Sequence, residues 1–508
     1  MLRRLLRKNA LFLRISALLL LWSERLQQWL YQQLAARYLR SPVGLLLLIG
    51  IIGIVAIIVS ALGLKGGLAL FGMIIGAPIL VACFFNLELG IMLTIVCSFF
   101  VTFFRKFSTI PFGTALDGLL LLLLGGLLYR LVKERNFKFA THPISLMIYI
   151  WIFYNLLQVI NPLSPSITGW LYAVRSLALW LIIYFVAFHS INSLRFIKRF
   201  LVLTTALMLL SALYGLKQEY LGFSAQEMTW LQADPLRYQL YFTWSRLRVF
   251  SLFADPTSFG IAMAYWGVFC LILATAKFST WKRIALVVAA FPMFLSMAYT
   301  GSRTPILMVA VGAVFYVLMN LNPKTIAIGV VLAMIGGVFV LKSTSNPVIF
   351  RIQSAFSPQD DSSMQLRLKN QNFIQPYIQS HPMGAGLATI GVWGRRFNAN
   401  SWLADFAPDS AYVRVAVECG WIGLIIYLAM FLIALWYSVH YFFRVKDPTI
   451  KIIYLGLTNV IFLIAVANYP QEAAYMLPTN LVFNVILAIV VRLKDFDENY
   501  STQRRLEE

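Results

Sequence analysis

Residues 420–439 read GWIGLIIYLAMFLIALWYSV and contain no charged side chain. An apolar run of roughly 18 or more residues is long enough to cross a bilayer as a helix. Runs of this kind recur along the whole chain, which has 508 residues and is 60% hydrophobic and only 12% charged. A soluble protein of this length carries roughly twice that charged fraction. The sequence therefore predicts an all-α, polytopic membrane protein and excludes a single soluble core.

The apolar runs predict about 12–14 transmembrane helices. Their expected bounds are 42–63, 66–85, 87–104, 115–133, 143–161, 172–190, 198–217, 257–276, 283–299, 304–321, 324–342, 411–441, 450–468 and 476–493. Residues 1–40, which precede the first run, combine basic side chains with Trp22 and Trp29. This composition is typical of an amphipathic helix on the cytoplasmic leaflet, with a first spanning helix as the alternative.

Lysine and arginine gather in alternate connections between the predicted spans. Examples are 130–138, 195–199, 277–283 and 444–451. Because cytoplasmic loops of membrane proteins carry such an excess, these connections are predicted to be cytoplasmic. The net charge of +22 therefore reflects topology and not nucleic-acid binding, since the basic residues are scattered between apolar spans.

This orientation divides the chain at its outer-face segments. The expected parts are an interfacial helix (1–40), a first group of transmembrane helices (41–217), an outer-face loop (218–256), a second group (257–342), a large periplasmic loop (343–410), a third group (411–493) and a cytoplasmic tail (494–508). The large loop is expected to contain short helices near 363–380 and 402–406. Long loops are uncommon and are often functional.

The outer-face segments contain many arginines, contrary to the positive-inside pattern. They are Arg237, Arg246, Arg248, Arg303, Arg351, Arg367, Arg395 and Arg396. The planar guanidinium group binds phosphate oxygens through two parallel hydrogen bonds and stays charged in any site. The set therefore favours a substrate with a diphosphate headgroup and a lipid tail, although a solvated side chain remains the alternative for each arginine taken alone.

Three local patterns stand out among these segments. The first, RLRVFSLFADPTSFG at 246–260, ends in an Asp-Pro pair that is expected to cap and start a helix. The second, TGSRTP at 300–305, is a tight connection that holds Arg303 near the membrane surface. The third is HPMGAG at 381–386, followed by APDSAY at 407–412 and ECGWIG at 418–423.

Taken in this order, the patterns resemble those of the O-antigen ligase/polymerase family, over roughly residues 200–440. The resemblance implies a helical enzyme similar to the GT-C class in the bacterial inner membrane. Such an enzyme moves a glycan from undecaprenyl diphosphate to an acceptor glycan or lipid A core at the periplasmic face, in lipopolysaccharide or exopolysaccharide biosynthesis. It implies no metal and no other cofactor. The two arginines that hold the diphosphate in the family match Arg248 and Arg303.

The chain departs from the family's ligases at the position of the base. Ligases usually have a His-Asn pair there, and this chain has Asp409 and Ser410. An aspartate can act as the general base, but Asp409 is also a candidate N-cap for a helix that starts near Ala411. His381 is a candidate base or phosphate contact, with a turn residue as the alternative. The remaining candidate substrate-binding residues are Arg246, Arg367, Arg395 and Arg396.

Several other groups have ordinary structural interpretations. The cysteines lie within or at the ends of apolar runs without paired spacing and are expected to be packing residues; they are Cys83, Cys97, Cys270 and Cys419. Three charged residues in or near the spans are expected to pair with one another or with polar neighbours. They are Asp117, Arg175 and Glu418.

Aspartate in place of histidine slightly favours a polysaccharide polymerase over a ligase. One competing hypothesis is a transporter of inorganic carbon or of a lipid-linked sugar, because the segments at 22–24 and 214–218 also look like cyanobacterial relatives once linked to inorganic carbon transport. Transporters usually hold their binding groups near the bilayer midplane. The charges singled out above gather at one face, which favours an enzyme. A non-catalytic scaffold is a third hypothesis.

Overall fold

The computed structural model describes residues 76–497 except 109, 135–140, 165, 244–245, 324, 328, 331–333, 335–352 and 354–361, together with Ser60, Gly63 and Ile74. The chain divides into two compact units, 1–81 and 82–508, and the elements below belong to the second. The predicted surface helix at 1–40 and the predicted span at 42–63 lie outside the described residues, apart from two isolated positions. Most of the predicted span at 324–342 also lies outside them.

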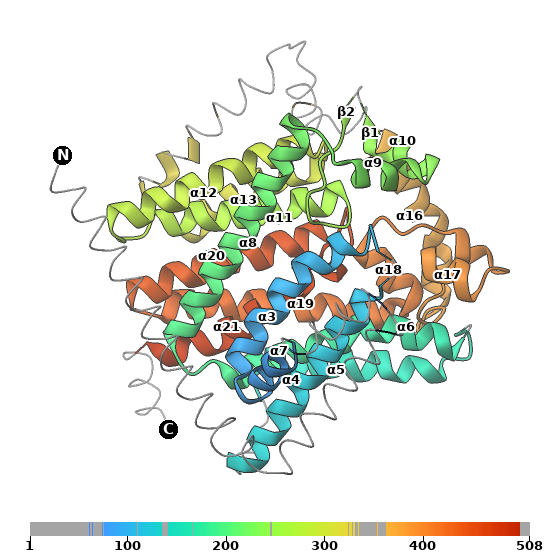
Figure 1. Ribbon diagram of the computed structural model, residues 1–508, viewed down its shortest axis with the longest axis horizontal. Coiled ribbons are helices and arrows are strands. Elements are labelled where there is room, and N and C mark those ends of the chain that lie inside the picture. The colour runs from blue at the N-terminus through green and yellow to red at the C-terminus, as the bar shows by residue number, and fades with distance from the viewer. Residues whose placement is uncertain are drawn as a thin grey trace. The chain divides into compact units, whose positions relative to one another are not determined.

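The described part of the chain is almost entirely helical (Figure 1). Its elements are α3 (Leu87–Phe104), α4 (Phe112–Glu134), α5 (Pro143–Leu157), η2 (Gln158–Ile160), α6 (Ile167–Leu177), η3 (Leu179–Leu181), α7 (Ile182–Ser190), α8 (Leu194–Tyr220), α9 (Ala225–Gln232), α10 (Pro235–Tyr241), β1 (Phe242–Thr243), β2 (Arg246–Leu247), α11 (Pro256–Ala274), α12 (Thr280–Tyr299), α13 (Arg303–Met319), α16 (Ser362–Ser380), α17 (Gly391–Phe397), η5 (Trp402–Asp405), α18 (Ala411–Glu418), α19 (Gly420–Arg444), α20 (Pro448–Ala467), η6 (Ala473–Tyr475), α21 (Thr479–Arg492) and η7 (Leu493–Phe496).

Nine helical segments in the described part are long and apolar enough to cross a membrane. They are Leu87–Phe104, Phe112–Glu134, Pro143–Ile160, Ile167–Ser190, Leu194–Tyr220, Pro256–Ala274, Thr280–Tyr299, Gly420–Arg444 and Pro448–Ala467. The helix Arg303–Met319 is apolar but shorter. The prediction of an all-α polytopic membrane protein is therefore confirmed.

Capping side chains explain where several of these helices begin. The Asp255 carboxylate accepts hydrogen bonds from the backbone N–H groups of Thr257 and Ser258, with Pro256 in the first turn of α11. Asp447 and Pro448 start α20 in the same way. Aspartate satisfies N–H groups that have no partner within the helix, and proline lacks the N–H that would be unpaired there. The predicted Asp-Pro start at 255–256 is confirmed.

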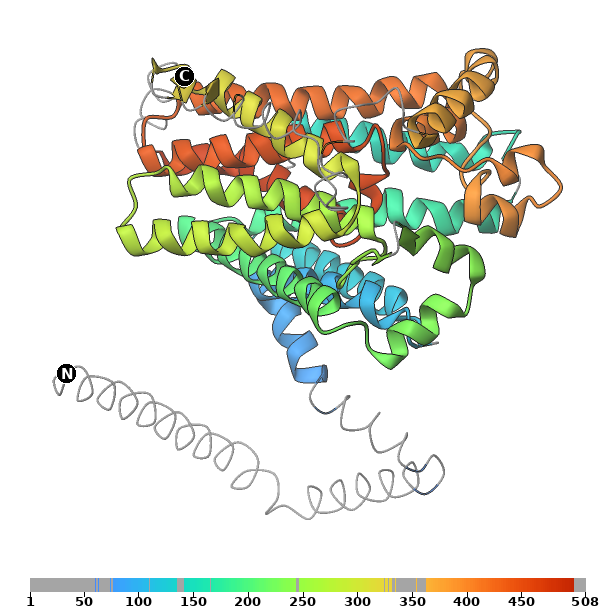
Figure 2. The same cartoon turned by 90° about the horizontal axis from the view of Figure 1, so that it is seen from above.

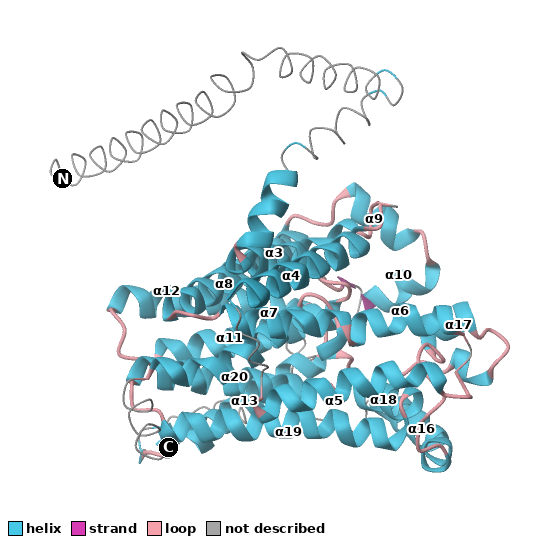
Figure 3. Ribbon diagram, turned by 90° about the horizontal axis from the view of Figure 1, so that it is seen from below, coloured by secondary structure: helices cyan, strands magenta, loops and turns pink. Residues whose placement is uncertain are grey.

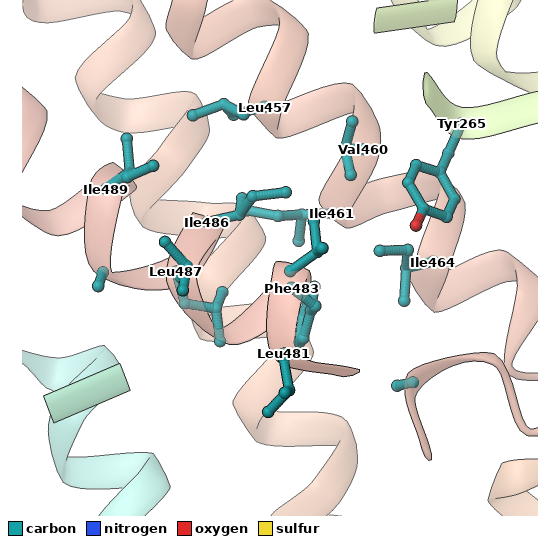
Figure 4. Close-up of a cluster of buried hydrophobic side chains, with 14 of the residues drawn as sticks. Tyr265, Leu457, Val460, Ile461, Ile464, Leu481, Phe483, Ile486, Leu487 and Ile489 are labelled. Atoms are coloured by element: carbon teal, nitrogen blue, oxygen red, sulfur yellow. The ribbon is translucent and has the colours of Figure 1, made fainter. Parts of the chain in front are cut away.

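The core of the bundle lies around α11, α20 and α21. In α11, 89% of the apolar stretch is buried, so this helix is enclosed on all sides by other helices. Figure 4 shows apolar side chains of α20 and α21, among them Ile461 and Ile486, packed together, with Ile464 of α20 close to Tyr265 of α11. These side chains are fully buried. Their packing fixes the ends of the three helices relative to one another.

Antiparallel neighbours bring distant segments to one end of the bundle. The Asn459 side chain of α20 donates to the carbonyl oxygen of Gly312 in α13 at 2.8 Å, so the middles of these two helices pack together. The Tyr265 hydroxyl, in the middle of α11, lies 3.2 Å from the hydroxyl of Thr479, the first residue of α21, so α21 begins beside the middle of α11. We call the end of the bundle at which α11 and α13 begin the motif end.

The helices of the two predicted outer-face segments lie at this same end. Helices α9, α10, α16 and α17 lie on one side of the bundle (Figures 1 and 2). The first turns of α12 and α20 lie on the other side. Helix α16 and the 3-10 helix η5 coincide with the short helices predicted in the large loop. Helix α17 and the β1–β2 hairpin, the one strand pair among the described residues (Figure 3), were not predicted.

The predicted span 411–441 is wrong as a single helix. It is two helices, α18 and α19, which meet at Cys419 and Gly420. Gly420 has φ of +70°, in the left-handed region that a right-handed helix cannot accommodate. The apolar run continues through the break, so hydropathy alone does not reveal it. The break leaves α18 as a separate short helix at the motif end.

Candidate functional site

Arg248 follows strand β2, and its side chain is fixed by surrounding polar groups. Its Nη2 atom donates to Ser302 Oγ at 2.6 Å and to Thr257 Oγ1 at 3.2 Å, and its Nε atom donates to the carbonyl oxygen of Thr300 at 2.8 Å. Burial lowers the pKa of this guanidinium group, and the nearby Asp255 carboxylate opposes that shift. Arg248 therefore joins the start of α11 to the α12–α13 turn.

Arg303 is the first residue of α13 and directly follows Ser302, the partner of Arg248. The turn that carries it is tight, because Gly301 has φ of +61°. A Cβ atom at Gly260 would lie 2.7 Å from Pro305 and 2.9 Å from the Thr300 hydroxyl, so α11 and the turn are in close contact. Two predicted arginines from separate sequence segments are thus brought to one place.

Lys106 contacts the segment just before α11, and it was not among the site residues predicted from the sequence. Its Nζ atom donates to the carbonyl oxygen of Phe253 at 2.5 Å and lies 3.8 Å from the centroid of the Phe250 ring and 5.0 Å from that of Trp230. Burial lowers its pKa to about 7, against the opposing effect of the Asp255 carboxylate. The available signal was a lysine just after the span 87–104, on the face where lysine is scarce.

The HPMGAG segment docks on the break between α18 and α19. The backbone N–H groups of Ala385 and Gly386 donate to the carbonyl oxygens of Val417 and Glu418 at 2.8 and 3.0 Å. A Cβ atom at Gly420 would collide with the carbonyl group of Pro382. The glycines of the two motifs therefore permit close backbone packing.

His381 ends α16 in a fixed orientation. Its ring stacks on Tyr377 with centroids 4.0 Å apart, and its Nδ1 atom lies 2.9 Å from both the Tyr377 carbonyl oxygen and the Ser380 hydroxyl. These contacts correspond to the turn interpretation of this residue. They hold the ring at the entry to the glycine-rich segment.

Asp409 directly precedes helix α18, and its side chain is exposed. The N-cap of α18 is Ser410, whose hydroxyl accepts from the backbone N–H of Val413. The alternative role of Asp409 as the N-cap is therefore wrong. Within the described part of the chain, no hydrogen bond or ion pair engages its carboxylate. It is consequently available to a ligand at the motif end.

The other predicted arginines lie in different surroundings. Arg367 of α16 donates to the carbonyl oxygen of Pro470 at 3.3 Å, beside the end of α20. Arg246 pairs with Glu219 at 2.9 Å. Arg396 lies 5.3 Å from the ring centroids of both Tyr172 and Phe397, and both it and Arg395 are exposed on α17. The site residues therefore share one end of the bundle but not one contact cluster.

Sequence reasoning missed a buried ion cluster on α18, the helix that starts two residues after Asp409. Arg414 of α18 donates to Glu472 at 2.6 Å and to Glu418 at 3.2 Å. Burial opposes the charge on Arg414, but the two carboxylates outweigh it and raise the pKa of the guanidinium group. The expected partner for Glu418 is thus found, as is the Arg175–Asp117 pair, at 3.2 Å. Arg414 and Glu472 are 58 positions apart, so sequence spacing gave no signal.

The fold and the site define a helical, multi-pass membrane protein that collects polar groups from distant segments at one end of its bundle. Residues 288–428 match the model of the O-Antigen ligase family. The match supports the resemblance to the O-antigen ligase/polymerase family that the motifs predicted. The family implies a glycosyltransferase-like enzyme that acts on lipid-linked glycans. No curated protein matches the chain.

The matched region contains Arg303, the HPMGAG segment and Asp409. Arg248 lies outside it. Its hydrogen bonds to the Thr300 carbonyl oxygen and to the Ser302 hydroxyl connect that arginine to the matched region. The tertiary structure therefore extends the candidate site beyond the part of the chain that the family model recognises.

Proposed function

We propose that this protein transfers a glycan from an undecaprenyl-diphosphate donor to a sugar hydroxyl of an acceptor at the periplasmic face of the bacterial inner membrane. The observation that carries the proposal is the contact of Arg248 with Ser302, which brings Arg248 to the residue directly before Arg303. Arg248 and Arg303 bind the diphosphate oxygens. A site of this kind fits a lipid carrier because it lies at the ends of membrane-crossing helices.

In the proposed reaction, the acceptor hydroxyl oxygen attacks the anomeric carbon of the donor sugar. The bond between that carbon and the diphosphate oxygen breaks, and the diphosphate leaves with the electron pair. Negative charge grows on the leaving group, so fixed guanidinium groups stabilise the transition state more than the ground state. The rigid hydrogen bonding of Arg248 keeps its guanidinium group in place throughout.

Asp409 serves as the general base that takes the proton of the acceptor hydroxyl. Its exposed carboxylate, free of a capping role, supports this assignment. Aspartate in place of the ligase histidine favours a polymerase, whose acceptor is a second lipid-linked repeat unit, over a ligase, whose acceptor is lipid A core. Arg246, Arg367, Arg395, Arg396 and His381 are proposed to contact the glycan or the lipid-linked headgroup.

The arrangement supports transfer over transport. The proposed diphosphate ligands stand at the starts of α11 and α13 and not halfway along these helices. A transporter usually places its binding groups near the bilayer midplane, within broken helices reached from both faces. Among the described helices, the break at Gly420 also lies at the motif end, beside α18.

Deletion of the gene, followed by gel analysis of surface polysaccharide, tests the proposal. A polymerase predicts single repeat units on core, and a ligase predicts full-length chains that are not attached to core. Complementation with the wild-type gene restores the pattern, and complementation with Arg303→Ala at equal protein level does not. Unchanged polysaccharide with impaired carbon uptake contradicts the proposal and favours transport.

A further inference from the structure

Arg414 and the residues around it form a second polar assembly at the motif end. We call the set Arg414, Glu418, Glu472 and Asn468 the α18 clamp. In it, one guanidinium group lies between two carboxylates from different segments, at 2.6 and 3.2 Å. The carboxylate side chains are only 3% and 12% exposed. Removing charges from water is costly, and apolar residues often hold helices together as well as a buried ion pair does. Stability alone therefore does not account for these buried charges, which points to a second role of the clamp.

Asn468 connects the clamp to the first turn of α18. Its carbonyl oxygen accepts from the backbone N–H of Ala411 at 3.0 Å and from the Ser410 hydroxyl at 3.2 Å. Its side-chain oxygen accepts from the backbone N–H of Ala474 at 2.9 Å, which folds the segment 468–475 back on itself. These bonds fix the two residues that directly follow Asp409.

The segment 468–475 also reaches a second candidate residue. Arg367 donates to the carbonyl oxygen of Pro470, two residues before Glu472. Arg414 itself lies one helical turn after Ser410, because its backbone N–H donates to the Ser410 carbonyl oxygen at 2.9 Å. One short segment thus determines the place of both Asp409 and Arg367.

We propose that the α18 clamp positions Asp409 and Arg367 for glycan transfer and sets the electrostatic field at Asp409. This inference rests on the proposed function, in which Asp409 is the base. Arg414 and Glu472 are positioning residues, because they act through Asp409 and not on the substrate. The other titratable groups that face Arg414 are Glu418, Cys419 and Tyr475.

The charges of the clamp predict the direction in which the pH–rate profile moves in each variant. Glu472→Gln removes an anion and leaves Arg414 less compensated, so positive potential at Asp409 rises. Arg414→Gln removes the cation and leaves two carboxylates, so negative potential rises. A nearby cation favours an ionised carboxylate and a nearby anion disfavours it. The acid limb of the pH–rate profile is therefore expected to move to lower pH in Glu472→Gln and to higher pH in Arg414→Gln, each by on the order of half a pH unit.

The test uses the full-length protein in lipid nanodiscs and the lipid-linked glycan extracted from the deletion strain. The rate of release of undecaprenyl diphosphate is followed from about pH 5 to 9, a range that covers carboxylate and imidazole titration. Folded fraction is measured in parallel by thermal unfolding. The expected result is a kcat about 10-fold lower in both variants, a donor KM within about 3-fold of wild type, and opposite shifts of the acid limb.

Arg175→Gln is the matched control, because Arg175 forms a comparable ion pair with Asp117 between α6 and α4. It is expected to lower thermal stability without moving the acid limb. Arg414→Lys keeps the cation and is expected to keep the wild-type limb, even where stability falls. If both Gln variants lose rate only in proportion to folded protein, with the limb unmoved, the clamp is structural and the inference fails. If wild-type protein releases no undecaprenyl diphosphate from the extracted lipid, the proposed function itself fails.

Discussion

The Nη2 atom of Arg248 lies 2.6 Å from the Oγ atom of Ser302, the residue directly before Arg303. This contact joins two segments that are 54 positions apart in sequence. It gives the proposed diphosphate site its most specific geometry, since hydrogen bonds to Thr257 at the start of α11 and to Thr300 and Ser302 in the α12–α13 turn hold the guanidinium group.

Arg248→Lys is expected to lower the rate of glycan transfer by about 100-fold, the usual effect of removing one fixed donor to a developing negative charge. Lysine keeps the charge but cannot form the planar set of bonds to Thr300, Thr257 and Ser302. Product release from lipid-linked donor measures the effect. Arg130→Lys, at an exposed ion pair with Glu134, is the matched control and is expected to leave the rate unchanged. A rate near wild type in Arg248→Lys contradicts the role.

Asp409 and Ser410 are adjacent, but substitution of Asp409 is expected to affect catalysis, whereas substitution of Ser410 is expected to affect stability. Asp409→Ala is expected to reduce transfer by about 100-fold or more, because general-base catalysis contributes on this scale. Its thermal stability is expected to match wild type, because the carboxylate is exposed and does not cap α18. Ser410→Ala is expected to destabilise the protein by about 1 kcal/mol through loss of the N-cap. Equal effects of the two substitutions on both readouts would argue against this division.

Gly420→Ala is expected to destabilise the protein by more than about 2 kcal/mol. The residue has φ of +70°, and a Cβ atom there would collide with the Pro382 carbonyl group of the HPMGAG segment. Thermal unfolding of the detergent-solubilised protein measures the loss. Gly118→Ala in α4 is the matched control, because a Cβ atom there meets nothing within 4 Å. That substitution is expected to be neutral or slightly stabilising, since alanine is the better helix former. Tolerance of alanine at 420 contradicts the close packing of the two motifs.

Lys106 is expected to make stability depend on pH. Burial lowers its pKa from 10.5 to about 7. Between these values the unfolded chain holds a proton that the folded protein has released, so stability rises as the pH increases from about 7 to about 10. Below pH 7 both states are protonated, and the folded protein carries the full cost of the enclosed charge.

The comparison with Lys106→Met isolates this effect, because methionine keeps the apolar stem and cannot titrate. The unfolding midpoint of the wild type is expected to rise with pH relative to that of Lys106→Met. If the unfolding midpoints of the two proteins change with pH in parallel, the ammonium group of Lys106 is not enclosed. That result would contradict the contacts of Lys106 with Phe250 and Phe253.

The sequence by itself determined the class of the protein and many of its helices. The predicted span 87–104 coincides with α3, and the Asp-Pro pair at 255–256 starts α11 as expected. These features follow from local physics, because the length of an apolar run and the identity of a capping residue act within one helix. The ordered motifs also indicated the family, since they lie in recognisable sequence context.

Only the tertiary structure decided which of these side chains meet. The hydrogen bond of Arg248 to Ser302, the pairing of Arg414 with Glu472 and the break at Gly420 all depend on segments that pack together from distant parts of the chain. Hydropathy averages over a window and cannot detect a single left-handed glycine, and spacing cannot reveal a partner 58 positions away. Long-range contacts are set by how helices pack, which no local pattern encodes.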